Sequence, residues 1–315
     1  MADLPHRELG GLTVSAVGLG CNNFGRRVDL EGTRAVVDAA LDAGVNFLDT
    51  ADVYGNAGGS ETLLGEVLKG RRDRVVLATK FGMDMGDNGP SGRPRGSKAY
   101  IRESIDGSLR RLQTDVIDLY QYHRPDGETP IEETLGALHE LVQAGKVRYI
   151  GCSNFTASEL AEAAGAAREI GFESFVSLQN EYSLLKRDIE ADVVPECEQL
   201  GVGVLPYFPL ASGLLTGKYR RGEAAPEGTR LAGRPQVADD ETFDRLEDAE
   251  RFARERGVEL LDVAIAGLAA QPTVTSVIAG ATKPEQVRAN AAALRWAPSP
   301  DDLEELNRIF PTPRR

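Results

Sequence analysis

Four polar residues follow apolar runs of the sequence, at points where strands are expected to end. Asp49 ends one run and Tyr54 comes five residues later, while Lys80 and His123 end the next two runs. Taken singly, each also fits an ordinary structural role, because loop tyrosines, solvated lysines and structural histidines are common. If the strands are parallel neighbours, however, the four side chains converge at one place. These residue types hold and transfer protons, so the group is a candidate catalytic site.

The elements that must position these residues recur along the chain at a nearly regular interval. Most of the apolar runs start about 30 residues apart, which is the length of one βαβ unit. Eight such runs favour a closed (β/α)8 TIM barrel over an open sheet. The runs begin at Val17, Asn46, Val75, Val116, Val147, Val176, Val202 and Val274.

The segments between the runs carry helical patterns. Ile101, Ile105, Leu109 and Leu112 recur at steps of four, four and three residues, which predicts one apolar stripe along a helix. Capping signals predict where three other helices begin. These signals are Thr129 with Pro130 and Glu132, Thr156 with Glu159, and Thr282 with Glu285.

Two steps are longer than the repeat, and both predict long loops. The segments 81–96 and 211–240 follow the third and seventh barrel strands, so they would wall a substrate cleft at the C-terminal face of the barrel. Before the first barrel strand, RELGGLTVS predicts a β-hairpin that closes the other end. We see no linker, so residues 1–315 are expected to form a single domain.

The composition argues against several classes of function. The chain of 315 residues carries 36 Lys and Arg against 49 Asp and Glu, a formal net charge of −13. Nucleic acids and anionic membranes attract basic proteins, so neither is an expected partner. The three cysteines have neither disulfide-framework nor metal-ligand spacing, and no metal is expected. No signal peptide or apolar run of about 18 residues is present, which predicts a cytoplasmic protein.

The ordered motifs of the chain resemble the aldo-keto reductase family from about Leu9 to Asn290. They are VGLGCNNFG, NFLDTADVYG, VVLATKFG, VIDLYQYHRPD, GKVRYIGCSNF, LQNEYSLL, FPLASGLLTGKY and VIAGATKPEQVRAN. The stretch LASGLLTGKY resembles the bacterial branch related to potassium-channel β-subunits and small-aldehyde reductases. The resemblance implies the same TIM barrel that the spacing predicts.

By this resemblance Asp49, Tyr54, Lys80 and His123 match the family's catalytic tetrad. Tyr54 would donate a proton to a carbonyl oxygen, and Lys80 would stabilise the tyrosinate left behind. Asp49 would keep Lys80 charged and oriented, and His123 would donate a hydrogen bond to the carbonyl oxygen. The implied activity is the NADPH-dependent reduction of aldehydes and ketones to alcohols.

The resemblance also implies where the cofactor binds. The chain has no GxGxxG motif of the Rossmann type, so NADPH would lie extended across the barrel mouth. NADPH is expected rather than NADH, although Gln286 stands where a phosphate-binding arginine is common and Ala289 where a glutamate is usual. The implied cofactor residues are Gly20, Cys21, Asn22, Asp49, Ser153, Asn154, Gln179, Tyr207, Pro209, Leu210, Ser212, Gly213, Leu214, Lys218, Gly280, Thr282, Lys283, Gln286 and Asn290.

The expected partner is a small carbonyl substrate. Arg124 directly follows His123, which indicates either an anionic substrate or a salt bridge with Asp126, and both alternatives stay open. A homo-oligomer is also left open. The substrate pocket is expected to include Phe24, Val53, Tyr54, Phe81, His123 and Arg124.

Two other functions use the same residues. Lys80 could form a Schiff base, as in barrel aldolases, with Tyr54 as a proton relay, but this leaves the cofactor motifs unexplained. Alternatively, the chain could be a nicotinamide-binding regulatory subunit with slow turnover, like the channel β-subunits it resembles. The tetrad would be present in either case.

Overall fold

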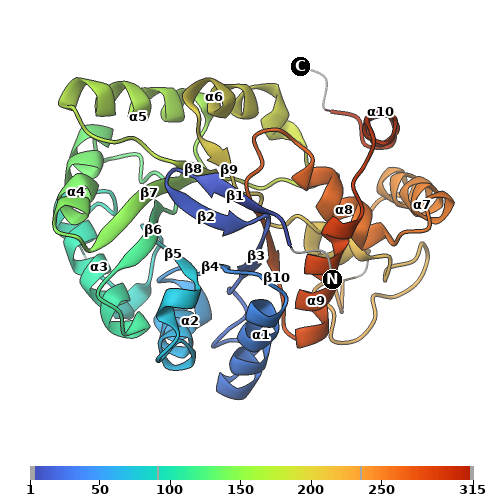
Figure 1. Ribbon diagram of the computed structural model, residues 1–315, viewed down its shortest axis with the longest axis horizontal. Coiled ribbons are helices and arrows are strands. Elements are labelled where there is room, and N and C mark those ends of the chain that lie inside the picture. The colour runs from blue at the N-terminus through green and yellow to red at the C-terminus, as the bar shows by residue number, and fades with distance from the viewer. Residues whose placement is uncertain (1–3, 91, 235, 313–315) are drawn as a thin grey trace.

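The strands of the computed structural model form the predicted barrel (Figure 1). The structure describes residues 4–90, 92–234 and 236–312. Eight parallel strands follow one another in the order β10-β3-β4-β5-β6-β7-β8-β9, and bridges from Val204 to Val274 and from Tyr207 to Ile278 join the two ends. The strands are β3 (Val17–Gly20), β4 (Phe47–Asp49), β5 (Val76–Phe81), β6 (Ile117–Tyr122), β7 (Val147–Ser153), β8 (Ser177–Gln179), β9 (Gly203–Val204) and β10 (Val277–Gly280).

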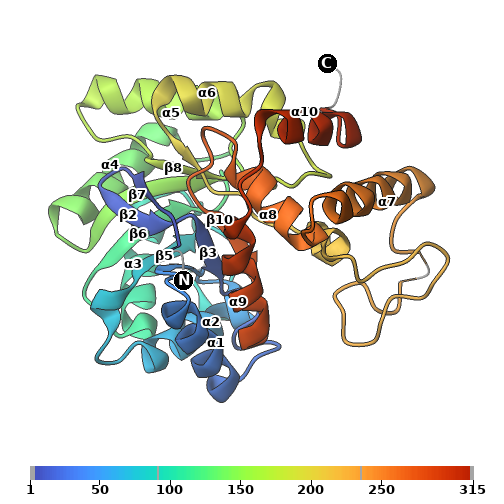
Figure 2. The same cartoon turned by 45° about the vertical axis from the view of Figure 1, so that its right-hand side comes forward.

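Helices surround the strands, and two additional helices pack at one side of the ring (Figures 1 and 2). The connecting helices are α1 (Leu30–Asp42), α2 (Tyr54–Val67), α3 (Lys98–Leu112), α4 (Ile131–Gln143), α5 (Ala157–Ile170), α6 (Val193–Leu200), α8 (Leu260–Ala269) and α9 (Pro284–Ala292). The additional helices are α7 (Asp240–Glu255) and α10 (Pro300–Ile309). Short 3-10 turns are η1 (Arg72–Arg74), η2 (Gly86–Asn88), η3 (Asp188–Ala191), η4 (Ala211–Thr216) and η5 (Ala293–Arg295). In Figure 2 residues 217–234, which follow η4, form a long loop outside the ring of strands.

Of the three predicted helix caps, that of α5 is confirmed and those of α4 and α9 are wrong. Thr156 and Glu159 form the expected capping box at the start of α5. Thr129 does not cap α4, because its amide and hydroxyl donate hydrogen bonds to Asp126 at 2.9 and 2.8 Å. That helix begins after Pro130, which has no side-chain cap bond. The Asp126 carboxylate therefore holds Thr129 in the loop before α4, so Thr129 is not the N-cap of this helix.

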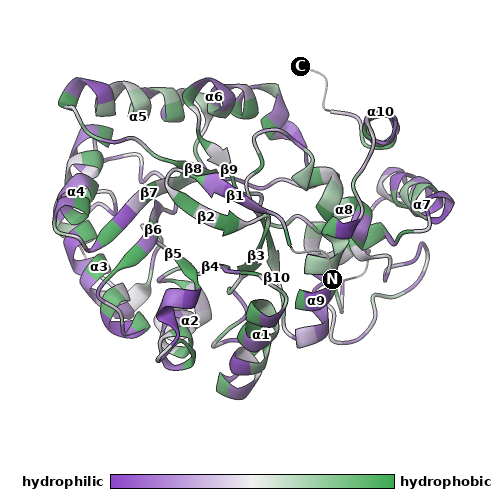
Figure 3. Ribbon diagram, in the orientation of Figure 1, coloured by the Kyte–Doolittle hydropathy of each residue, from purple (hydrophilic) through white to green (hydrophobic). Residues whose placement is uncertain are grey.

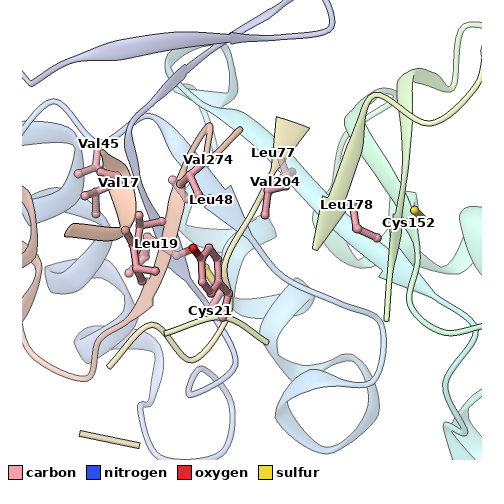
Figure 4. Packing of buried hydrophobic residues seen from close by; sticks show 14 of the residues in the cluster. Val17, Leu19, Cys21, Val45, Leu48, Leu77, Cys152, Leu178, Val204 and Val274 are labelled. Carbon is pink, nitrogen blue, oxygen red and sulfur yellow. The ribbon is translucent and has the colours of Figure 1, made fainter. Parts of the chain in front are cut away.

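Alternation along the barrel strands separates two apolar layers. One face of each strand packs against the helices, and Figure 4 shows part of that layer. The opposite face fills the barrel interior, where Phe47 and Leu119 pack with Leu9 and Leu12 of the N-terminal hairpin. This hairpin, β1 (His6–Leu9) with β2 (Leu12–Ser15), is the one predicted, and it closes the end of the barrel away from the C-terminal strand ends. Its turn uses Gly10 at φ +62°.

The outer helices carry hydrophilic residues on much of their surface, whereas the strands are a mixture of hydrophobic and hydrophilic stretches (Figure 3). Helix α7 shows this most clearly, because Asp240, Asp244 and Glu247 surround Arg221 on its exposed side. No helix within 4–90, 92–234 and 236–312 is both long enough and apolar enough to span a membrane. Much of the acidic surplus therefore lies away from the barrel mouth.

Phe47 offers a test of the interior packing, because its side chain is fully buried between the hairpin and the strands. Phe47→Ala is expected to lower the free energy of unfolding by about 3–5 kcal/mol, since it removes an aromatic ring and leaves a cavity. Leu30→Ala is the control, because Leu30 is 39% exposed and should cost less than about 0.5 kcal/mol. Urea unfolding of both variants makes the comparison, and equal losses would contradict the described core.

Candidate active site

The four residues singled out in the sequence meet at the C-terminal ends of neighbouring strands. Asp49 ends β4, Lys80 lies near the end of β5, and His123 directly follows β6. The Lys80 ammonium lies 2.6 Å from an Asp49 carboxylate oxygen and 3.5 Å from the Tyr54 hydroxyl. The Tyr54 and His123 rings meet edge to face, with centroids 5.8 Å apart. Parallel pairing of the strands therefore brings together residues that are 74 positions apart at most.

The ion pair between Lys80 and Asp49 is buried and fully hydrogen-bonded. The Lys80 side chain has 0% exposure, and its ammonium also donates to the Thr50 carbonyl at 3.0 Å. The second Asp49 oxygen accepts from the amides of Gln121 and Gln179, both at 3.0 Å. Burial opposes the charge of Lys80, but Asp49 and Tyr54 hold its pKa above the ordinary value. The lysine is therefore a fixed cation beneath the tyrosine.

Tyr54 presents its hydroxyl to this cation because of an unusual start to α2. The backbone from Gly55 to Gly58 has positive φ values, so the regular helix begins only after a left-handed turn. Gly55 is required there, since a Cβ atom would lie 2.4 Å from the Phe24 carbonyl oxygen. Burial raises the pKa of Tyr54, and Lys80 acts in the opposite direction. The phenol therefore keeps its proton at neutral pH, and any tyrosinate formed would be stabilised by Lys80.

His123 is a neutral ring in this environment. Burial, together with the charges of Lys80 and Arg124, lowers its pKa to about 3. Its Nδ1 atom is buried and has no hydrogen-bond partner within the described part of the chain. Its backbone carbonyl accepts a hydrogen bond from the Asn154 amide at 3.0 Å, which ties the end of β6 to the end of β7. A neutral imidazole can donate one hydrogen bond to a carbonyl oxygen without adding charge.

A cavity of about 680 Å³ lies over this group. Its floor includes Asp49, Tyr54 and His123, while Lys80 lies beneath the floor and is fully buried. Most of the cofactor residues implied by the resemblance line it, at the positions Gly20, Cys21, Asn22, Asp49, Ser153, Asn154, Gln179, Tyr207, Pro209, Leu210, Ser212, Gly213, Lys218, Gly280, Thr282, Gln286 and Asn290. Leu214 packs against the apolar core and the Lys283 side chain is exposed, so neither lines the cavity.

Polar contacts hold one wall of the cavity in place. The Asn154 amide group donates to the Ser153 hydroxyl at 3.0 Å, and its carbonyl accepts from the Tyr207 hydroxyl at 2.9 Å. Asn154 has φ +60°, and its backbone amide is held by the Gln179 carbonyl and the Asn180 side chain. Phe208 and Ser212 also have positive φ values, and both line the cavity. Strained backbone of this kind is concentrated at functional sites in proteins.

The mouth of the cavity is positive although the protein is negative. Four cations line it, Arg27, Arg124, Lys218 and Arg230, against the acids Asp49 and Glu285. Because Asp49 is already paired with Lys80, the surplus charge faces the cavity. Of these cations, Arg124 and Lys218 were expected at the site from the sequence. Arg27 and Arg230 were missed, because nothing in a loop sequence indicates which arginines turn inward.

At the start of α9, two backbone amides donate hydrogen bonds to a side chain of the same helix. The helix begins at Pro284 with Lys283 as its N-cap residue, so the predicted cap of Thr282 with Glu285 is wrong. The carbonyl oxygen of Gln286 accepts instead from the Thr282 amide at 2.8 Å, the Thr282 hydroxyl at 3.2 Å and the Lys283 amide at 3.3 Å. Donors arranged in this way at a helix N-terminus also suit an anion.

Two of the expected substrate-pocket residues lie in the core, and a third does not line the cavity. Phe81 follows Lys80 on β5, so strand alternation turns it away from the barrel interior, where it stacks on Tyr120 and Tyr122. Phe24 is fully buried in the layer between strands and helices. Val53 precedes α2 and is half-buried outside the cavity lining. Tyr54, His123 and Arg124 line the cavity as expected.

Comparison with known proteins identifies the family of this barrel. The model of the Aldo/keto reductase family matches residues 16–310 of the chain. The chain belongs to the aldo/keto reductase family. Members of this family are oxidoreductases that generally use NAD(P)H, so the activity of this chain falls in that class.

Relatives of this aldo/keto reductase match it over nearly their whole length. One is an uncharacterized oxidoreductase, YrpG, of Bacillus subtilis, 40% identical over 96% of this chain and 94% of the relative. A probable voltage-gated potassium channel subunit beta of Oryza sativa is 35% identical over 97% and 96%. The protein of the same name in Arabidopsis thaliana is 34% identical over 98% and 97%.

Gln121 is the site residue of this aldo/keto reductase that the sequence could have revealed but did not. It lies two positions before His123 on β6, so strand alternation places both on the same face. Its amide helps Gln179 to hold the Asp49 carboxylate. The period of two along a predicted strand was the available signal.

The buried ion pair leads to a stability prediction. Asp49→Ala is expected to lower the free energy of unfolding by about 3–5 kcal/mol, because it leaves the Lys80 charge buried without its partner. The matched control is Asp38→Ala, which breaks a half-exposed ion pair with Arg71 and should cost less than about 1 kcal/mol. Both values come from urea unfolding. Similar losses in the two variants would contradict the burial described for the pair.

Proposed function

We propose that this aldo/keto reductase is an NADPH-dependent enzyme that reduces aldehydes and ketones to alcohols. The observation that carries the proposal is the fixed Lys80 cation, which lies 3.5 Å from the Tyr54 hydroxyl and beneath the floor of a cavity with a positive mouth. A protonated tyrosine over a buried cation is arranged to release a proton and to tolerate the charge that remains. A cytoplasmic location is proposed as well, since all three cysteines are free and buried.

The residues lining the cavity fit a nicotinamide dinucleotide. Ser153, Asn154 and Gln179 offer polar groups for the nicotinamide carboxamide, and the Tyr207 ring beside them offers a flat face. Gly213 has φ +96°, and a Cβ atom there would meet the Lys218 ammonium at 2.6 Å, so glycine lets backbone and cation approach a diphosphate together. The amides at the start of α9 suit a phosphate. When bound, NADPH supplies the hydride.

The chain's own residues handle the proton. A carbonyl carbon that accepts a hydride leaves negative charge on its oxygen, and Tyr54 donates its proton to that oxygen. Lys80 stabilises the tyrosinate until a proton from solvent restores the phenol, and Asp49 keeps Lys80 in place. Neutral His123 donates a hydrogen bond to the same oxygen. One carbonyl, one hydride and one proton thus become one alcohol.

The same geometry weakens the Schiff-base alternative. An amine attacks a carbonyl only when it is unprotonated and accessible. Lys80 is buried, its ammonium donates to Asp49 and Thr50, and its pKa is raised. These three features favour an electrostatic role for the lysine over a nucleophilic one.

The names of the plant relatives favour a second candidate, a nicotinamide-binding regulatory subunit with slow turnover. The two functions differ in what the protein does with bound cofactor. Single-turnover oxidation of bound NADPH by an aldehyde, followed by steady-state turnover, separates them. Rapid multiple turnovers support the enzyme, whereas one slow turnover with cofactor-dependent capture of a channel subunit supports the regulatory protein.

The proton-donor assignment is tested by Tyr54→Phe, which removes only the hydroxyl. We expect kcat for benzaldehyde reduction to fall by about 10²–10⁴-fold, because the developing alkoxide loses its acid. NADPH affinity, measured by fluorescence titration, should stay within about 3-fold, which shows that the site is intact. Wild-type turnover in this variant would make the assignment of Tyr54 wrong.

The cofactor preference is tested at Gln286. Wild-type kcat/KM is expected to be higher with NADPH than with NADH, and the reverse order would overturn the preference. Gln286→Glu changes the side chain little in size but places negative charge among the α9 amides. We expect NADPH affinity to weaken by about 10-fold and NADH affinity by less than about 3-fold, because only NADPH brings a 2′-phosphate to be repelled.

A further inference from the structure

Arg124 is a cation at the active site that the proposed chemistry leaves without a role. It directly follows His123 at the end of β6 and lines the same cavity as Tyr54 and His123. Burial is the main cause of the lowered pKa of His123 and of the raised pKa of Tyr207, and the charge of Arg124 adds to the first shift and opposes the second. Arg124 therefore acts on the tetrad side of the cavity. Across the described residues, no ion pair and no side-chain hydrogen bond involves Arg124.

Asp126, the acidic residue nearest to Arg124 in the sequence, is hydrogen-bonded to other groups. Asp126 accepts from the amides of Gly96 at 2.6 Å, Glu128 at 3.0 Å and Thr129 at 2.9 Å, and from the Thr129 hydroxyl at 2.8 Å. Burial opposes its charge, but these hydrogen bonds lower its pKa to about 2. The carboxylate therefore anchors the loop after β6 to the loop after β5. This removes the salt bridge with Asp126 that the sequence had left open for Arg124.

The other cations of the mouth are placed differently. Lys218 lies against Gly213 in the segment after β9, and Arg230 stacks over the Phe208 ring with its guanidinium carbon 4.6 Å from the centroid. Arg27 donates to the Gly228 carbonyl in the same long segment. These three belong to the β9 side of the cavity, where the small residues suited to a diphosphate lie. Arg124 extends instead from the β6 end, next to the hydrogen-bond donor of the proposed reaction.

We propose that Arg124 is a specificity-determining residue and that the substrates of this enzyme are carbonyl compounds bearing a carboxylate. The inference rests on the proposed reductase function and adds the substrate class. A guanidinium can bind a carboxylate through two parallel hydrogen bonds, which holds the rest of the molecule in one orientation. With the carboxylate at Arg124, the carbonyl group of the same molecule can reach Tyr54 and His123, and Met83 and Phe208 offer apolar contact to the part between.

The test compares two matched substrate pairs, each with a charged and a neutral member. The aromatic pair is 4-carboxybenzaldehyde and methyl 4-formylbenzoate, and the aliphatic pair is 4-oxobutanoate and its methyl ester. Two pairs are used because they separate carbonyl and carboxylate by different lengths. The variants are Arg124→Gln, Arg124→Lys and a control, Arg110→Gln, which makes the same charge change at an exposed arginine of α3. Each is assayed for kcat and KM with NADPH.

The wild type is expected to prefer the charged member of at least one pair. Arg124→Gln should lower kcat/KM for that member by about 10–100-fold, chiefly through KM, as for a lost hydrogen bond to a charged group. The neutral member should change by less than about 3-fold, which separates this effect from an indirect one on His123. Arg124→Lys should keep part of the preference, because lysine keeps the positive charge but cannot donate the two parallel hydrogen bonds of a guanidinium. Arg110→Gln should match the wild type.

Two results would overturn the inference, and they differ from a failure of the proposed function. If the wild type shows no preference for the charged member of either pair, or if Arg124→Gln slows both members equally, the substrate class is wrong although the reductase stands. If the wild type reduces none of the four aldehydes, the proposed function fails and the substrate class fails with it.

Discussion

The buried contact between Lys80 and Asp49 is the interaction on which the rest of this site depends. Removing two charges from water is costly, and the attraction between them offsets that cost only when every remaining hydrogen-bonding position is satisfied. Here those partners come from the ends of three strands. They are Thr50 directly after β4, Gln121 near the end of β6 and Gln179 at the end of β8. The barrel brings these three partners to the same point as Lys80 and Asp49. A cation with 0% exposure is then available beneath the Tyr54 hydroxyl.

Strand periodicity explains both what the sequence could predict and part of what it could not. The eight strands followed from apolar runs at regular spacing, and Asp49, Lys80 and His123 stood out at the ends of three of these runs, which all end at the same face of a parallel barrel. Their assignment to a tetrad with Tyr54 came from the family resemblance. The alternation of side chains along a strand also puts Lys80 and Phe81 on opposite faces of β5, and it would have identified Gln121 as a site residue. Phe81 was instead expected in the substrate pocket, where proximity in sequence was a poor guide to orientation.

Loop residues were harder to place, because their orientation depends on contacts distant in the sequence. Thr129 was expected to cap α4, but Asp126 bonds it, and that same carboxylate also holds Gly96, 30 positions away. Arg230 enters the cavity mouth by stacking on Phe208, a pairing that no local pattern indicates. Arg27 shows the same limit, because its place at the cavity depends on a hydrogen bond to the carbonyl of Gly228, which is 201 positions away.

The central claim is that the charges of Lys80 and Asp49 serve proton transfer and are not needed for the fold. The double variant Asp49→Asn with Lys80→Met removes both charges together, so no unpaired charge stays buried. We predict that its unfolding free energy stays within about 1–2 kcal/mol of the wild type, while kcat for aldehyde reduction falls by about 10²-fold or more. A folded double variant that reduces the aldehyde at the wild-type rate would contradict the account.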